Sequence, residues 1–175
     1  MSGHIITSLF LLAPIAVLIT YYDVRYRRIP NLFVIATLIN GIVINTWNSG
    51  LEGLLLSLKG GAIAFGLMLV LHVFSAMGAG DVKLFGAIGA LIGASLVLKT
   101  FMIVVLTGGV LALVLSAYAG KLRETMNRVM LIFVNLLSGW QPPRFPTPTD
   151  HKQTIPYGVA ITFGTIISLA FFRHQ

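Results

Sequence analysis

The sequence predicts an all-α, polytopic membrane protein, and three observations support this fold class. Its 175 residues are 57% hydrophobic and only 10% charged. The mean hydropathy is +0.92, and several apolar runs are long enough to cross the roughly 30 Å hydrocarbon core of a bilayer. These runs lack the alternation of polar and apolar residues that is typical of membrane β-barrels. Because a helix satisfies its own backbone hydrogen bonds in lipid, we expect each run to be helical.

Six transmembrane helices are predicted by counting the apolar runs between charged or Gly/Pro-rich breaks. The first run has no basic n-region and no small-residue cleavage site before Asp23, so we interpret it as a retained helix and not as a signal peptide. Pro14 should kink this helix. No soluble domain fits between the runs, and residues 1–175 are expected to form a single transmembrane domain. The expected helices are 4–22, 31–47, 53–75, 82–98, 100–119 and 155–172.

The longest break, 120–154, contains the ten-residue apolar run VMLIFVNLLS and ends in QPPRFPTPTD. That run is too short to span a bilayer, so it predicts a short interfacial helix at about 129–138. The proline-rich end indicates an extended connector. A buried or re-entrant seventh segment is the alternative interpretation of the same run.

The distribution of Lys and Arg over the breaks predicts the orientation in the membrane. Nine of the 12 lie on one side when the breaks are assigned alternately, which places that side in the cytoplasm and both termini outside. The same bias accounts for the net charge of +7, so we expect a multi-pass membrane protein that contacts lipid and has no nucleic-acid partner. The nine are Arg25, Arg27, Arg28, Lys83, Lys121, Arg123, Arg128, Arg144 and Lys152, against Lys59, Lys99 and Arg173 outside.

Two aspartates at predicted helix ends are the candidate catalytic residues. Asp23 follows the first apolar run, and Asp81 lies in the glycine-rich stretch MGAGDVK, both on the predicted cytoplasmic side. Asp23 alone could be a solvated loop residue, but two carboxyls held close together share a proton and supply both a base and an acid. The chain has no cysteine, which excludes thiolate metal sites and cysteine nucleophiles. We expect no metal and no cofactor.

Three short motifs occur in order along the chain. They are D-x5-IPN from Asp23 to Asn31, GAGDVK from Gly78 to Lys83, and IPYG from Ile155 to Gly158. These motifs resemble those of type IV prepilin peptidases, the bacterial GxGD intramembrane aspartyl proteases, and most closely the short forms of tight-adherence (Flp) pilus systems. The resemblance implies an endopeptidase of the inner membrane that cuts the leader from prepilin or pseudopilin substrates at the cytoplasmic face.

The resemblance also implies roles for individual residues. Asp23 and Asp81 match the two catalytic aspartates, and Gly78 and Gly80 match the glycines of the GxGD loop. Lys83 matches the lysine that follows the second aspartate. It could lower the pKa of a carboxyl or bind a substrate carbonyl, or its position could reflect only the excess of basic residues on the cytoplasmic side. The remaining candidates, at the rim of the site or toward the substrate, are Pro30, Asn31, Pro156 and Gly158.

One departure from the longer members of that family concerns a second activity. Those members carry a cysteine-bearing cytoplasmic insert between the first two helices and also methylate the new pilin N-terminus. Here the second predicted helix follows Asp23 after a short connection, and there is no cysteine. We therefore expect proteolysis without N-methyltransferase activity.

Several polar and small residues lie within the apolar runs. His72 is either a proton relay or a histidine hydrogen-bonded between helices. Asn40 and Asn45 are expected to hydrogen-bond between helices. Gly89 and Gly93 in GAIGALIGA should let another helix approach closely, either within the bundle or from the substrate.

Two functions of other classes fit parts of the pattern. A proton-coupled transporter or channel could use Asp23, Asp81 and His72 as a relay, but the acids lie at one edge and no internal repeat is found. A structural subunit of a secretion machine would leave the paired aspartates unexplained. The sequence does not specify the substrate or the oligomeric state.

Overall fold

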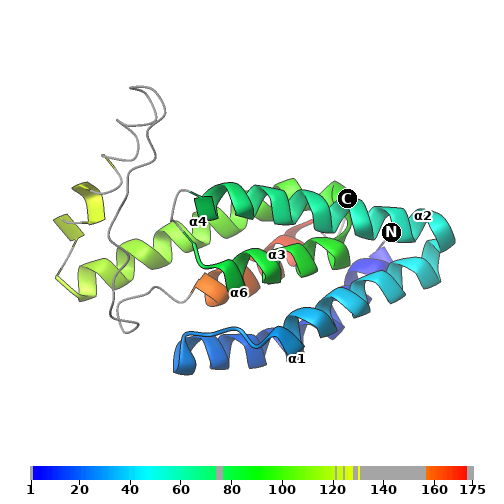
Figure 1. Cartoon of the computed structure of the whole chain (residues 1–175), viewed down its shortest axis with the longest axis horizontal. Coiled ribbons are helices and arrows are strands. Elements are labelled where there is room, and N and C mark those ends of the chain that lie inside the picture. Colours follow the sequence, from blue (N-terminus) through cyan, green and yellow to red (C-terminus); the bar gives the residue numbers. More distant parts are fainter. Residues whose placement is uncertain are drawn as a thin grey trace.

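The computed structural model describes residues 2–73, 77–120, 122–123, 125–127, 130 and 157–172, with side chains of the first helix from residue 13 onward. In these ranges the regular elements are all helices and there is no strand, which confirms the all-α prediction (Figure 1). Most of the 120–154 loop, the expected interfacial helix and Pro156 lie outside the described residues. The helices are α1 (Ser2–Tyr26), α2 (Asn31–Val73), α3 (Ala79–Ile92), α4 (Ala94–Tyr118) and α6 (Tyr157–Phe171).

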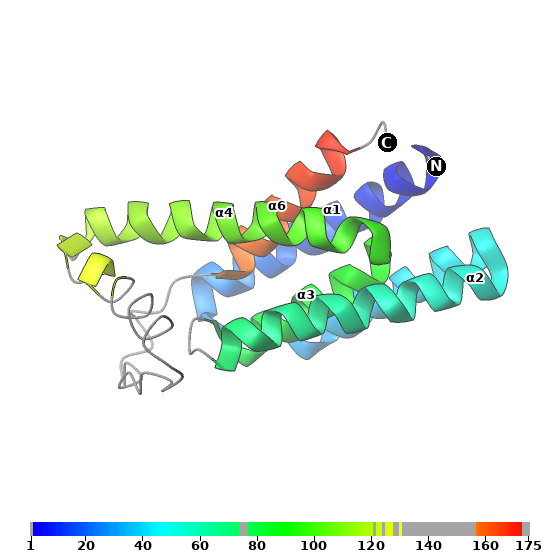
Figure 2. The same ribbon diagram turned by 90° about the horizontal axis from the view of Figure 1, so that it is seen from above.

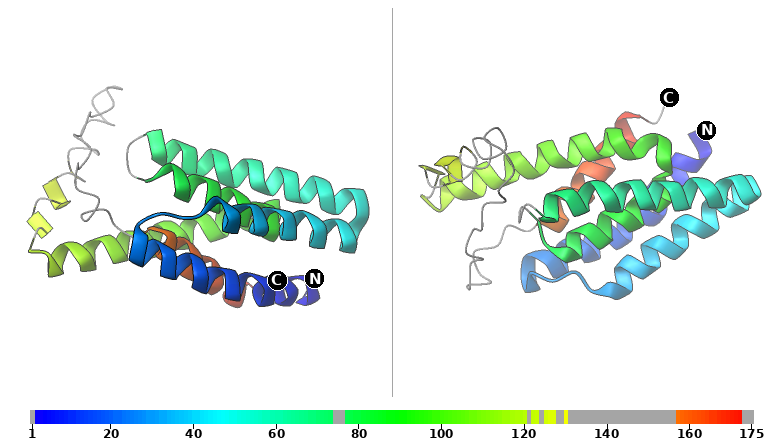
Figure 3. Two further views of the ribbon diagram at one scale, coloured as in Figure 1. Left: turned by 60° about the horizontal axis from the view of Figure 1, so that its bottom comes forward. Right: turned by 45° about the horizontal axis from the view of Figure 1, so that its top comes forward.

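The long α2 is a helical hairpin of two arms. Its backbone leaves helical geometry at Gly50, where φ is 56° and ψ is −133°, a conformation that glycine adopts at little cost. The arms fold back toward each other with α3 between them (Figures 1 and 3). The two helices predicted at 31–47 and 53–75 correspond to these arms, so the predicted break is confirmed.

The predicted boundary between 82–98 and 100–119 is wrong. The break lies at Gly93, which has φ 76° and ends α3 at Ile92. Lys99 instead lies inside α4, with its ammonium group 4.7 Å from the centre of the Phe172 ring. The charge of Lys99 had indicated the boundary between these two helices. The helix instead ends at Gly93, because glycine adopts a positive φ at little cost.

α1 is longer than the predicted 4–22. It continues to Tyr26, so Asp23 lies in its last turn and not in the following loop. By length and composition, two helices of the described part, α2 and α4, are apolar and long enough to cross a membrane. The helices α3 and α6 have 14 and 15 residues.

Small residues bring the second arm of α2 against α3. A Cβ atom placed on Gly89 would contact the Ala64 Cβ and lie 2.5 Å from the Gly60 carbonyl oxygen. A Cβ on Gly41, in the first arm, would lie 2.6 Å from the Leu91 nitrogen. The predicted close approach at Gly89 is therefore confirmed within the bundle. At Gly93, which ends α3, the second arm is close as well, because a Cβ on Gly60 would lie 2.9 Å from the Gly93 carbonyl carbon.

Asn45 ties the two arms of α2 to the end of α3. Its side-chain amide donates to the Ser57 hydroxyl at 2.8 Å and to the Ala90 carbonyl at 3.0 Å. The carbonyls in the last turn of a helix have no partner within the helix, so this contact satisfies one of them. The interhelical role predicted for Asn45 is confirmed; Asn40 makes no such bond within the described ranges.

The remaining helices cover α3 from the other side. α1 and α6 lie side by side, and α4 packs against α6 (Figure 2). Buried hydroxyl pairs connect them, with Thr100 and Ser168 at 2.8 Å between α4 and α6. The core between these helices contains Ile19, Met68, Phe85, Ile88, Ile161 and Leu169, all less than 2% exposed.

Candidate active site

The two predicted catalytic aspartates meet where three helix ends converge. Asp23 lies in the last turn of α1 and is 6% exposed, and Asp81 lies in the first turn of α3 and is 9% exposed. The negative charge of Asp23 acts directly on Asp81 and raises its pKa. The fold thus brings together two carboxyls that are 58 positions apart in the sequence.

The first turn of α6 faces the carboxyl of Asp23. The amides of Gly158 and Val159 stabilise its charged form, as does the guanidinium of Arg27. These amides belong to the first helical turn, where N–H groups have no partner within the helix and the helix dipole favours negative charge. Burial acts in the opposite direction and more strongly, so the pKa of Asp23 is raised above its ordinary value. One oxygen, Oδ2, is buried with no hydrogen-bond partner in the described part of the chain.

Gly158 leaves no room for a side chain beside this carboxyl. A Cβ atom at Gly158 would lie 2.8 Å from Asp23 Oδ2 and 3.2 Å from the end of the Ile29 side chain. The hydroxyls of Thr20 and Thr162 lie 3.1 Å apart and fix α1 against α6 about one turn away from Asp23. The backbone of α6 can therefore approach Asp23 closely.

Asp81 is held by its own glycine loop. The N–H of Gly78 donates to Asp81 Oδ2 at 3.1 Å, as an acidic residue does at the third position of a helix. Desolvation by burial raises the pKa of Asp81 to about 7; the charge of Asp23 contributes to this rise, whereas the Gly78 amide and His72 oppose it. Both carboxyls lie beyond the ends of the apolar runs 4–22 and 82–98.

His72 anchors the loop that precedes Asp81. Its Nδ1 atom lies 2.7 Å from the carbonyl oxygen of Met77, just before Gly78. The histidine therefore hydrogen-bonds to a loop and not to a facing helix, a third possibility that the sequence argument did not consider. Its charge also acts on Asp81.

Ile29 was not predicted as a site residue. Its side chain contacts the position of a Cβ on Gly158 and lies 3.9 Å from that of Gly80, so it fills the space between the first turns of α6 and α3. The isoleucine belongs to the IPN motif, and that position was the available signal in the sequence.

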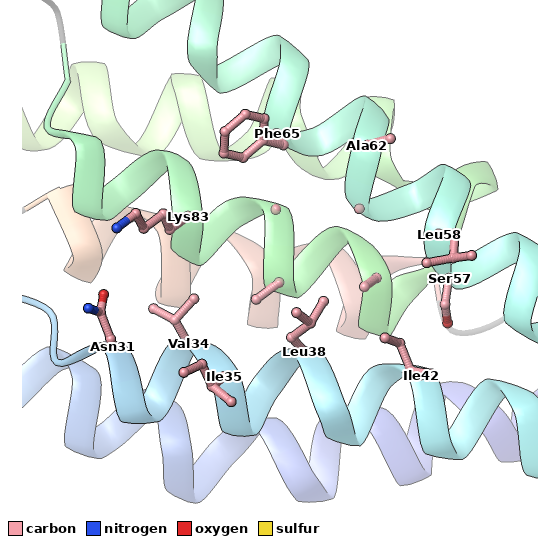
Figure 4. Close-up of a pocket in the computed structure, with 14 residues that line it drawn as sticks. Asn31, Val34, Ile35, Leu38, Ile42, Ser57, Leu58, Ala62, Phe65 and Lys83 are labelled. Atoms are coloured by element: carbon pink, nitrogen blue, oxygen red, sulfur yellow. The ribbon is translucent and has the colours of Figure 1, made fainter.

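Other predicted site residues lie on a different face of α3. Lys83 and Asn31 line one end of an apolar groove between the arms of α2 (Figure 4). Residues two apart on a helix point to different sides, so Lys83 faces away from the carboxyl of Asp81. Pro30 stands between the two regions, where its carbonyl accepts the N–H of Phe33 at 3.1 Å and begins α2.

No cluster of three or more metal-binding side chains is found among the described residues. The chemistry that the described groups can perform is acid–base catalysis by two buried carboxyls, the charge of one of which acts on the other. Such a pair can activate water when one carboxyl is ionised and the other is protonated.

A sequence profile of the type IV leader peptidase family matches residues 10–113. The chain belongs to the type IV leader peptidase family. The family predicted from the three motifs is thereby confirmed. The matched region of this leader peptidase family member includes Asp23 and Asp81, whereas Gly158 lies outside it.

One curated relative is similar over most of this chain. It is the Prepilin leader peptidase/N-methyltransferase of Legionella pneumophila, 31% identical over 131 residues. The alignment covers 70% of this family member but 46% of the relative, so the chain spans about half the length of that protein. No solved structure matches the chain.

Proposed function

We propose that this member of the type IV leader peptidase family is a membrane-embedded aspartyl endopeptidase that removes the leader from prepilin or pseudopilin substrates. The observation that carries the proposal is the buried pair of carboxyls, Asp23 and Asp81, at the meeting point of α1, α3 and α6. The family supports the substrate class, and the burial and mutual electrostatic effect of the two carboxyls support their choice as catalytic groups.

The surroundings of the two carboxyls favour different roles. Burial raises the pKa of both, and that of Asp81 reaches about 7, so we assign the proton to Asp81. At Asp23 the amides of Gly158 and Val159 oppose the rise and favour the ionised form. Asp23 takes a proton from water as the water oxygen bonds to the scissile carbonyl carbon, and Asp81 gives its proton to the carbonyl oxygen. On collapse, the proton on Asp23 passes to the leaving nitrogen, and Asp81 recovers a proton from the tetrahedral intermediate.

The arrangement of helix ends supports a site at the cytoplasmic face of the inner membrane. The end of α1 and the starts of α3 and α6 lie on one side of the bundle, whereas the turn within α2, the junction of α3 and α4, the start of α1 and the end of α6 lie toward the other side (Figure 2). Alternating crossings of six segments, with both termini outside, have this pattern. Large apolar side chains also face outward, as lipid contact requires, among them Trp47, Leu51 and Leu106, which are 88%, 71% and 68% exposed.

A proton-coupled transporter gains no support from the placement of His72. Its ring nitrogen is engaged by the Met77 carbonyl at the loop before Asp81. Asp23, Asp81 and His72 lie at helix ends, and transporter ion sites commonly lie near the midplane.

Substitution of each aspartate tests the proposed function. Asparagine is nearly isosteric with aspartate but exchanges no proton near neutral pH, so Asp23→Asn and Asp81→Asn should each abolish cleavage of a prepilin-like peptide by the detergent-purified chain. The double variant should resemble either single one, because residues that act as a unit fail together. Glu52→Gln, on an exposed residue near the turn of α2, is the matched control and should cleave normally. Substantial cleavage by either aspartate variant, with no wild-type enzyme present, contradicts the mechanism.

A further inference from the structure

The groove between the two arms of α2 is polar at one end and apolar along the rest of its length. It has a volume of about 590 Å³, with α3 as its floor. Lys83 and Asn31 lie together at one end, and Leu38, Ile42 and Leu58 lie farther along it (Figure 4). This polarity matches a ligand with an anionic head and an apolar tail.

The groove is long enough for an extended hydrocarbon chain. Between Asn31 and Ile42 the first arm rises about 16 Å at roughly 1.5 Å per residue. A volume of about 590 Å³ along that length leaves room for one such chain to lie between the arms.

An extended peptide is disfavoured by the chemistry of the lining. Its amides would need hydrogen-bond partners throughout, because water is absent at that depth. The lining is almost entirely aliphatic or aromatic, and the hydroxyl of Ser57 is already engaged by Asn45 and by the Gly41 carbonyl. A hydrocarbon chain requires no such partners.

The cation at the polar end selects the head group. No acidic side chain pairs with Lys83 in the part of the chain that the structure describes. In the orientation proposed above, this end lies at the cytoplasmic leaflet, whose anionic lipids attract Lys and Arg. The groove also lies across α3 from the carboxyl of Asp81, so an occupant there does not meet the catalytic pair.

We propose that the groove is a binding site for one anionic phospholipid, with an acyl chain between the arms of α2 and the phosphate at Lys83 and Asn31. The proposal rests on the proposed membrane orientation but not on proteolysis. Because α3 forms the floor of the groove and carries Asp81 in its first turn, the bound lipid braces the helix that presents this carboxyl.

Lipid retention by the full-length chain in detergent tests the head-group contact. Native mass spectrometry with added dioleoylphosphatidylglycerol should show one tightly retained molecule per chain. Dioleoylphosphatidylcholine has the same acyl chains and should bind at least about fivefold more weakly. Lys83→Gln should weaken phosphatidylglycerol binding by about fivefold and remove the preference. Lys59→Gln, on an exposed lysine of the second arm outside the groove, should change neither. Equal retention of the two lipids by the wild type, or equal behaviour of the two lysine variants, overturns the proposal.

A second pair of variants tests the acyl-chain contact. Ala62→Phe places a ring in the groove and should weaken binding of both lipids, whereas Ile63→Phe, on the adjacent exposed residue outside the groove, should not. Unchanged lipid binding by Ala62→Phe contradicts the assignment of the groove.

Competition with a prepilin-like peptide tests the alternative occupant. If the peptide displaces the lipid, and Lys83→Gln weakens binding of the peptide but not of the lipid, the groove binds substrate and the lipid proposal is wrong. Because lipid binding is measured without cleavage, its failure is distinguishable from failure of the proposed protease activity.

Discussion

Gly158 is the residue at which the chain leaves no space for a side chain beside the carboxyl of Asp23. Gly158→Ala would place a methyl group 2.8 Å from Oδ2, so either the carboxyl or the first turn of α6 must move. Misplacement of a catalytic group by about 1 Å costs on the order of 100-fold, and we expect peptide cleavage to fall at least tenfold. Gly109→Ala, where an added Cβ meets nothing within 4 Å, is the control and should retain the wild-type rate. Normal cleavage by Gly158→Ala contradicts the proposed geometry.

The pH dependence of cleavage should follow the carboxyl pair. Asp81 must be protonated to act as the acid, and its pKa is raised to about 7, so activity should fall as the pH rises through about 7. Asp23 must be ionised to act as the base, and its pKa is also raised from 3.8, so activity should fall again on the acidic side at a pH above 3.8. The two limits of the bell-shaped profile belong to the pair and not to single residues. Cleavage that rises steadily to pH 9 contradicts this assignment of acid and base.

Asp23 and Asp81 could be proposed from the sequence because acidic residues are few in this chain and each of the two lies at the end of an apolar run. The separation of Lys83 from Asp81 could not be predicted, because their two-residue spacing places them on different faces only if a helix already includes both. Ile29 was not predicted as a site residue, because an apolar residue carries no chemical signal of its own. The contacts of Ile29 with two glycines of other helices exist only in the folded chain.

The crossing of α3 with the second arm of α2 depends on backbones that touch. Gly89→Ala would place a methyl group against Ala64 and the Gly60 carbonyl, neither of which can rotate away. Overpacking of this kind typically costs about 1–3 kcal/mol, and we expect a free energy of unfolding in detergent that is lower by that amount. Gly66→Ala, in the same arm with open space around it, should be neutral or stabilising by up to about 1 kcal/mol. Equal stability of the two variants would mean that the helices are not in contact at Gly89.

At the level of elements, hydrophobicity predicted where helices lie better than where they end. The break in α2 was predicted because residues 48–52, NSGLE, contain a glycine and a charged residue between two apolar runs. The end of α3 was misplaced because Gly93 sits within an apolar run and Lys99 appeared to be the natural boundary. A lysine can place its charge against an aromatic ring and remain within a helix, as Lys99 does at Phe172.

The orientation of the whole molecule can be tested with single cysteines, because the chain has none of its own. Cysteine at Ser49, exposed beside the turn of α2, should react with an impermeant thiol reagent added outside intact cells. Cysteine at Tyr118, 88% exposed near the opposite end of the bundle, should react only after the cells are opened. The reverse pattern would place the carboxyl pair outside the cytoplasm and contradict the proposed site of cleavage.

Whether this family member also methylates its product stays a prediction. From the sequence we expect a processed pilin with a free, unmodified N-terminus, whereas the Legionella relative is named for both activities. The mass of the mature pilin, measured with and without this protein in the producing cell, decides the question. A methyl group that depends on this protein alone would contradict the expectation.

The contact between Gly158 and Asp23 also has a consequence for biosynthesis. Asp23 and Asp81 leave the ribosome well before α6, yet the amides that favour the charged form of Asp23 belong to α6. A nascent chain that has inserted α1 to α4 therefore carries both carboxyls without the surroundings that distinguish base from acid. If the proposed activity is correct, proteolysis would begin only when α6 packs against α1 and α4, and the chain would be inactive during its own membrane insertion.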